Sequence, residues 1–124
     1  EHNVFFTVHC VKCTPAVYEV LSTLGPFPKG FIMHGYSGPS DFVMKFAELG
    51  AYFSVSGYYY QLSPNRQKAM EDTIRKIPQD RLLFESDAPD MAAIPEVLIA
   101  YDEENSANTP NCIPYVLQKG YAQF

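Results

Sequence analysis

The sequence predicts an α/β protein with a parallel sheet, because three features of the chain agree on this class. Apolar runs of strand length alternate with segments that have helical periodicity. Each strand and the helix after it take roughly 20 to 30 residues, as βαβ units do. Glycine or proline separates the successive elements, and no internal repeat or low-complexity tract competes with this reading.

The first half of the chain contains two strand–helix pairs. Residues 3–9 are rich in β-branched and aromatic side chains, which predicts a strand, and a helical pattern follows over 14–24. The apolar run 30–34 predicts the second strand. A proline, a serine and an aspartate then signal the start of a helix over 39–49, which a glycine ends.

The second half continues the alternation. Residues 51–56 predict a third strand, and a tyrosine-rich loop leads to a charged amphipathic helix over 63–76. An Ile-Pro pair ends this helix before the fourth strand, 81–87. Residues 91–110 are the least regular and predict a loop with a short helix, and a last helical pattern begins at Ile113.

Bulk composition limits the classes of function. With 124 residues and 47% hydrophobic content, the chain forms one domain or part of one, and we expect a soluble protein without a membrane span or signal peptide. Three cysteines cannot all pair within one chain, which favours a reducing, intracellular location, cytoplasmic or nuclear. A formal charge of −5 argues against broad adhesion to nucleic acid, but not against a nuclease that holds a phosphodiester through metal ions.

Three of the four predicted strands end in a side chain that can bind metal. In a parallel (β/α) barrel of the TIM type, chemistry collects at the C-terminal ends of the strands. The first strand ends in His9, the second in His34 and the fourth in Asp87. Two imidazoles and a carboxylate suit Zn²⁺ or, with more oxygen ligands, Mn²⁺ or Mg²⁺. The sequence therefore predicts a catalytic metal site.

Each of these residues also has an ordinary structural interpretation. His9 and His34 could be strand-end histidines satisfied by backbone groups, and Asp87 could cap the following helix. Glu85 is in phase with Asp87, and a second carboxylate facing a barrel interior is costly unless it pairs or coordinates. It could orient a ligand or bond to a neighbouring backbone group.

Other polar residues near the predicted site are less specific. Lys12 lies in the loop after the first strand, where it could meet a phosphate or simply be solvated. Cys10 and Cys13 have the C-x-x-C spacing of a redox-active dithiol or of half a zinc site. The sequence contains no second C-x-x-C pair that would complete a zinc site. Cys10 should point away from His9, toward the helices. The tyrosines at 58–60 could stack on bases or serve as plain packing.

Four segments together resemble the TatD family of metal-dependent deoxyribonucleases, which are TIM barrels. They are Val-His-Cys at 8–10, Met-His-Gly-Tyr-Ser-Gly at 33–38, Tyr-Phe-Ser-Val-Ser-Gly at 52–57 and Arg-Leu-Leu-Phe-Glu-Ser-Asp-Ala-Pro at 81–89. The last is the most specific. The resemblance covers nearly the whole chain and implies that residues 1–124 are the C-terminal half of such a barrel, with about its last four βα units.

The resemblance also implies roles for individual residues. His9, His34 and Asp87 fall on metal-ligand positions, with two divalent ions expected in the full-length protein, and Asp87 would accept the proton of the nucleophile. DNA is the expected substrate, and Tyr36 is an expected substrate contact. The family often has an arginine where Val11 stands here, so Lys12 is the expected phosphate contact if it substitutes for that arginine. The family's first-strand His-x-His pair and its later glutamate ligand are absent here. They would come from a missing N-terminal half, or a second chain could pair the open sheet edges.

Two other functions remain open at this point. A related amidohydrolase would cleave an amide or ester with one or two zinc ions. A truncated, non-catalytic interaction fragment would keep the fold pattern without a complete site. If the full-length protein is the nuclease, the isolated chain is expected to be nearly inactive on DNA.

Overall fold

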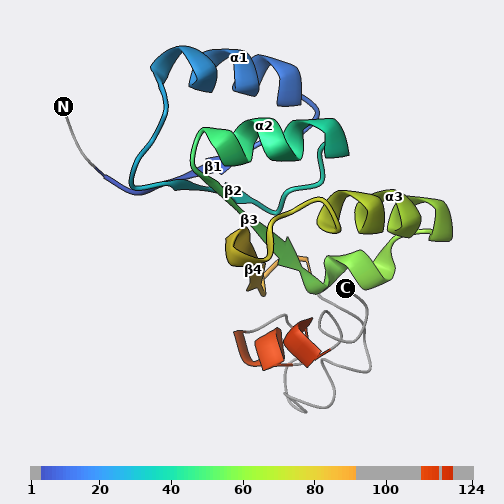
Figure 1. Cartoon of the computed structure of the whole chain (residues 1–124). Coiled ribbons are helices and arrows are strands. Elements are labelled where there is room, and N and C mark those ends of the chain that lie inside the picture. The colour runs from blue at the N-terminus through green and yellow to red at the C-terminus, as the bar shows by residue number, and fades with distance from the viewer. Residues whose placement is uncertain (1–3, 92–109, 115, 119–124) are drawn as a thin grey trace. The chain divides into compact units, whose positions relative to one another are not determined.

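The structure is a computed structural model that describes residues 4–91, 110–114 and 116–118 (Figure 1). It divides the chain into two compact units. The first contains the residues up to Ser54 together with Asp72–Leu83, and the second contains Val55–Glu71 and the residues from Phe84 onward. Within the described residues, no helix is long and apolar enough to cross a membrane.

Strands and helices alternate along the chain as the sequence predicts. The strands are β1 (Phe6–His9), β2 (Phe31–His34), β3 (Ala51–Ser56) and β4 (Leu82–Glu85), and the α-helices are α1 (Thr14–Leu24), α2 (Val43–Glu48) and α3 (Pro64–Ile74). The four strands form one sheet in the order β1-β2-β3-β4, and β2 pairs in parallel with both β1 and β3. The expected α/β class with a parallel sheet is therefore confirmed.

Several element boundaries differ from the expectation. β1 begins at Phe6, so Val4 and Phe5 precede the strand and are exposed. A 3-10 turn over 40–42 starts the helical segment before α2, and the predicted tyrosine loop is a 3-10 helix over 57–61. β4 spans Leu82–Glu85, so the predicted strand, 81–87, was one residue too long at its start and two at its end.

The C-terminal part of the chain is described only in short stretches. Helical backbone occurs at residues 113–114 and 116–118, in agreement with the predicted last helix, and a 3-10 turn precedes it at Pro110–Cys112. The predicted loop at 91–110 lies almost entirely outside the described residues.

One face of the strands in the first unit is covered by helices. Figure 1 shows α1 and α2 on the same side of β1 and β2. Phe31, Met33 and Phe53 on the strands, and Phe46 on α2, have no exposed surface. The Tyr18 ring of α1 meets the Phe46 ring edge-on at a centroid distance of 5.5 Å. This apolar layer fixes the strands, so the residues at their C-terminal ends have a defined position.

Candidate metal centre

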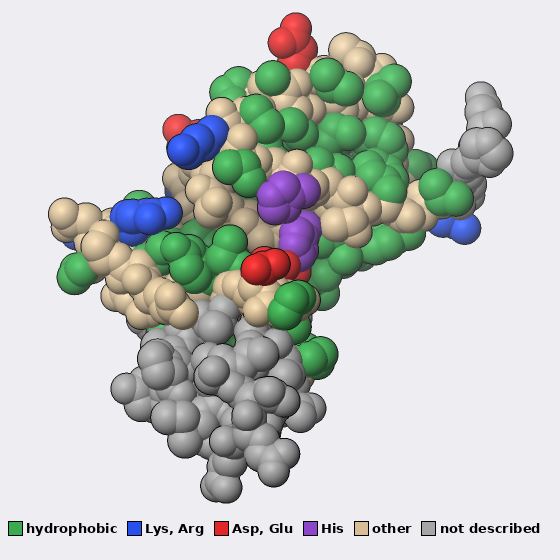
Figure 2. All heavy atoms as spheres, turned by 180° about the vertical axis from the view of Figure 1, so that it is seen from behind, with side chains coloured by type: hydrophobic (Ala, Val, Ile, Leu, Met, Phe, Trp, Pro, Cys, Tyr) green, Lys and Arg blue, Asp and Glu red, His purple; other side chains and the backbone are tan. Residues whose placement is uncertain are grey.

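His9 and His34 lie side by side at the ends of neighbouring strands. They are direct partners in the parallel β1–β2 register, and their ring centroids are 5.6 Å apart with an interplanar angle of 41°. His9 is exposed and His34 is half-buried. Figure 2 shows two histidine side chains next to each other on the molecular surface. The structure therefore brings together two of the three predicted ligands within the first unit.

Ser54 on β3 holds the loop that follows His34. Its hydroxyl accepts a hydrogen bond of 3.1 Å from the Gly35 N–H, and its carbonyl accepts one of 3.1 Å from the Tyr36 N–H. Gly35 has a φ of 55°, a conformation that glycine adopts without steric cost. Ser54 itself is buried. The sequence analysis gave this serine no role, although it belongs to the Tyr-Phe-Ser-Val-Ser-Gly segment.

Tyr36 differs from its expected role as a substrate contact. Its side chain is only 1% exposed, its hydroxyl donates a 2.9 Å hydrogen bond to the Pro39 carbonyl, and its ring packs edge-on against Phe53 at 5.2 Å. Desolvation by burial, with a further contribution from Cys10, raises the pKa of the phenol. The ring packs in the aromatic layer and the hydroxyl is used within the loop, so Tyr36 has a packing role in this structure, and its contact with substrate stays a prediction.

The loop between β1 and α1 carries the other predicted contact. Lys12 is exposed and has a φ of 57°, which is an uncommon conformation for a residue with a side chain. Cys10 is buried in the layer under the helices, as expected for the residue after His9. Desolvation raises the pKa of the Cys10 thiol.

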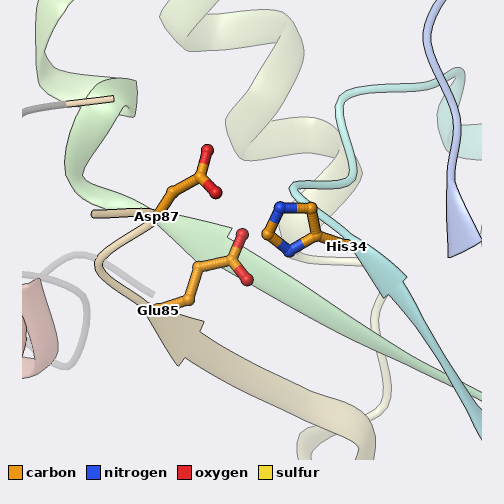
Figure 3. A group of neighbouring side chains, drawn as sticks. All are labelled: His34, Glu85 and Asp87. Carbon is orange, nitrogen blue, oxygen red and sulfur yellow. The ribbon is translucent and has the colours of Figure 1, made fainter. Parts of the chain in front are cut away.

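The second unit contains two neighbouring carboxylate side chains, Glu85 and Asp87. Glu85 is the last residue of β4 and Asp87 follows two residues later, and carboxylate oxygens of the two lie within 4.8 Å of one another. Both side chains are half-buried. Figure 3 shows the two carboxylates extending to the same side of their segment. Two carboxylates this close repel each other when both are ionised, and a bound cation relieves that repulsion.

A tight turn sets the position of Asp87. Its φ of 53° lies in the left-handed region, where aspartate is enriched compared with most residues. The Ser86 hydroxyl accepts a 3.2 Å hydrogen bond from the Ala88 N–H and so closes the turn around Asp87. Strand periodicity therefore ends before Asp87, and a local turn positions this carboxylate.

The chemistry of the available donors fits a divalent cation. In the first unit, His34 at the end of β2 offers an imidazole nitrogen. In the second unit, Glu85 at the end of β4 and Asp87 just beyond it offer carboxylate oxygens (Figure 3). Imidazole nitrogens and carboxylate oxygens both bind Zn²⁺ and Mn²⁺. Glu85 was left with alternative roles by the sequence, and its two-residue spacing from Asp87 was the available sign that the two carboxylates lie close together.

Comparison with known proteins identifies the family to which the chain belongs. The family described as TatD related DNase matches residues 1–123. The chain therefore belongs to the TatD-related DNase family.

Individual relatives agree with that assignment. An "Uncharacterized metal-dependent hydrolase" of Haemophilus influenzae is 30% identical over 91 residues, which cover 73% of this chain and 33% of the relative. The "Uncharacterized metal-dependent hydrolase YabD" of Bacillus subtilis is 25% identical over 119 residues, covering 96% of this chain and 43% of the relative. The chain thus spans less than half the length of these relatives.

A solved structure supports the fold. The crystal structure of YjjV, a TatD homologue from Escherichia coli K12, superposes with a TM-score of 0.73 at 25% identity, and the match covers 94% of this chain and 40% of YjjV. The expected TIM-barrel-type fold, present here as part of a barrel, is confirmed. The chain belongs to a family of metal-dependent hydrolases.

Proposed function

We propose that the protein containing this chain is a divalent-metal-dependent nuclease that hydrolyses phosphodiester bonds of DNA. The observation that carries the proposal is the placement of metal-binding side chains at the C-terminal ends of β1, β2 and β4, in a chain of the TatD-related DNase family. In parallel barrels, this end of the strands is where catalytic residues collect.

The proposed metal ligands are the residues that the site description singles out. They are His9 and its register partner His34 in the first unit, and Glu85 and Asp87 in the second unit. Zn²⁺, Mn²⁺ and Mg²⁺ are the candidates. When bound, two such ions lower the pKa of a water and neutralise charge on the phosphoryl oxygens.

The chain's own residues then have distinct tasks. The Asp87 carboxylate accepts the proton of the attacking water, a role for which its fixed turn is suited. Lys12, exposed in the loop after β1, contacts a phosphate of the substrate. Because the net charge is −5, substrate affinity depends on the metal ions and a few such contacts rather than on a basic surface.

The remaining part of the site would come from outside these four strands. A barrel of this type closes with eight strands, and the relatives are more than twice as long as the matched region. We propose that a further segment or a second chain pairs the open sheet edges and supplies the other ligands. An intracellular location, cytoplasmic or nuclear, accords with three free cysteines.

A second candidate function is hydrolysis of an amide or ester by the same centre. It is favoured by the names of the relatives, which specify metal-dependent hydrolysis but not the bond that is cleaved. The two candidates differ in substrate only, so the same variants test both.

The decisive substitution is Asp87→Asn in the natural protein that contains this chain. It keeps the size of the side chain but removes the charge that binds metal and accepts the proton. We expect turnover of a labelled oligonucleotide to fall by about 100- to 10,000-fold with Mn²⁺ or Zn²⁺ present. Asp72→Asn, an exposed aspartate on α3, is the matched control and should retain full activity.

Assays on the purified wild-type and Asp87→Asn proteins also distinguish DNA hydrolysis from amide or ester hydrolysis. Chelator should abolish cleavage of the oligonucleotide, and Asp87→Asn should not change the thermal unfolding of the metal-free protein by more than a few degrees. Full nuclease activity in Asp87→Asn would refute the assignment. Metal-dependent cleavage of amide or ester substrates without cleavage of DNA would establish the second candidate in place of the first.

A further inference from the structure

Two cysteines beside the proposed metal site form a close thiol pair. Cys10 follows the last residue of β1 and Cys13 immediately precedes α1, and their sulfur atoms are 3.7 Å apart. Both are free thiols in this structure. The positive φ of Lys12 bends the short segment between them, which brings the two sulfurs to the same side.

The two thiols have unequal access to solvent. Cys10 is 7% exposed, belongs to the apolar core and lies 3.8 Å from the Thr14 hydroxyl. Cys13 is exposed. An exposed thiol with a buried partner within reach is the arrangement in which one sulfur meets the oxidant and the other completes a disulfide.

We propose that Cys10 and Cys13 are a reversible redox modification site, which a peroxide oxidises to an intramolecular disulfide. The nuclease reaction proposed above does not use these thiols, and the inference does not depend on it.

The oxidation balances with peroxide as the only co-reactant. The Cys13 thiolate attacks one peroxide oxygen, the O–O bond breaks, and a sulfenic acid forms with release of hydroxide. The Cys10 sulfur then attacks the Cys13 sulfur, loses its proton and displaces the oxygen as water. Two thiols give up two electrons and two protons, and hydrogen peroxide becomes two molecules of water.

Oxidation must bring the two sulfurs of the pair closer together. A disulfide requires a sulfur–sulfur distance of about 2.05 Å, so the two sulfurs at 3.7 Å have to approach each other. Because Cys10 is anchored in the core, most of the movement falls on the exposed Cys13.

Cys112 provides a control within the same molecule. It is also a free thiol, but it is 3% exposed, and burial raises its pKa, so the folded protein protects it from oxidants. Treatment of the folded 124-residue chain with hydrogen peroxide, followed by alkylation and intact-mass measurement, should show loss of two of the three thiols. Reductant should restore all three.

Trypsin then identifies the linkage, because Lys12 lies between the two cysteines. Cleavage after Lys12 should leave the two resulting peptides joined in the oxidised sample and separate after reduction. Cys112→Ser should behave like the wild type, whereas Cys13→Ser, an exposed substitution that leaves the core intact, should form no disulfide. Cys10→Ser should accumulate a sulfenic acid at Cys13 that dimedone labels.

Other outcomes overturn the proposal. They are three alkylatable thiols after peroxide treatment, a disulfide that includes Cys112, or irreversible oxidation of Cys13 without disulfide formation in the wild type. Stoichiometric binding of Zn²⁺ by Cys10 and Cys13 that blocks both alkylation and disulfide formation would assign the pair to metal binding instead.

Discussion

The two faces of β1 and β2 in the first unit differ sharply, although the same strands supply both. Toward the helices, Phe31 and Met33 are fully buried and contribute to a continuous apolar core. On the alternate positions, Thr7 and His9 are exposed and His34 is half-buried. Packing therefore uses one face, while the side chains that can bind metal project from the other.

This difference follows from the two-residue period of a strand. Successive side chains point to opposite faces, so His9 can stand beside a core residue without entering the core. Burying an imidazole or carboxylate among aromatic rings would cost several kcal/mol without a partner. The division should allow substitutions on one face to change stability and substitutions on the other to change metal binding.

The largest expected effect is on the helix-covered face. Phe53→Ala removes a fully buried ring that contacts Tyr36, and we expect a loss of about 3 to 5 kcal/mol in the free energy of unfolding. Denaturant titration of the metal-free chain measures this loss. Metal affinity of the remaining folded protein should stay within about twofold of the wild type. A loss below about 1 kcal/mol would show that this face is not a close-packed core.

The next effect concerns the opposite face. His34→Ala removes the proposed imidazole ligand, so Zn²⁺ or Mn²⁺ affinity measured by calorimetry should fall by at least about tenfold. The stability of the metal-free chain should change by less than about 1 kcal/mol, because His34 is only half-buried. Thr7→Ala, on the same face but without a ligand atom of this kind, is the control. Equal affinity in His34→Ala and Thr7→Ala would remove His34 from the site.

The sequence predicted this division where regular periodicity produces it. An apolar run of strand length was enough to place His34 at a strand end, and the parallel pairing found in the structure makes His9 its register partner. Periodicity failed at Asp87, because a turn with positive φ rather than a strand holds that residue. A turn of this kind depends on local hydrogen bonds, such as the one that Ser86 accepts, which residue patterns do not specify.

The positions of two further residues depend on the fold. The family resemblance implied a substrate contact for Tyr36, whereas in the structure its ring packs in an aromatic layer with Phe46 and Phe53. Ser54 was overlooked because a serine within a strand is usually uninformative. Its importance comes from a neighbouring loop 19 residues away in sequence, and only the fold brings the two together.

Ser54 is buried and also holds the loop that follows His34. Its substitution should therefore change both stability and metal affinity, each by a moderate amount. Ser54→Ala leaves the Gly35 N–H without its hydroxyl acceptor, which we expect to destabilise the chain by about 1 to 2 kcal/mol. Metal affinity should fall by less than in His34→Ala, because the ligand remains but is less well positioned. Ser37→Ala, an exposed serine in the same loop, is the matched control. Unchanged stability and unchanged affinity in Ser54→Ala would show that this serine does not position the loop.

The smallest expected change in the free energy of unfolding comes from Tyr36→Phe, which tests whether the Tyr36 phenol is buried in solution. Tyr36→Phe removes the hydrogen bond to the Pro39 carbonyl and should cost about 1 kcal/mol at neutral pH. Burial raises the pKa of this phenol, so its contribution to stability is fully present below the ordinary tyrosine pKa of about 10 and is lost as the pH rises through the folded-state pKa.

The difference between wild type and Tyr36→Phe should therefore shrink, and then reverse, in strongly alkaline solution. The chain has nine tyrosines, so the difference between the two proteins, rather than the wild-type curve alone, isolates Tyr36. Denaturant titrations at neutral pH and at increasing alkaline pH give that difference. A difference that stays constant with pH would show that the phenol titrates alike in the folded and unfolded chain, and would contradict the burial of Tyr36 in solution.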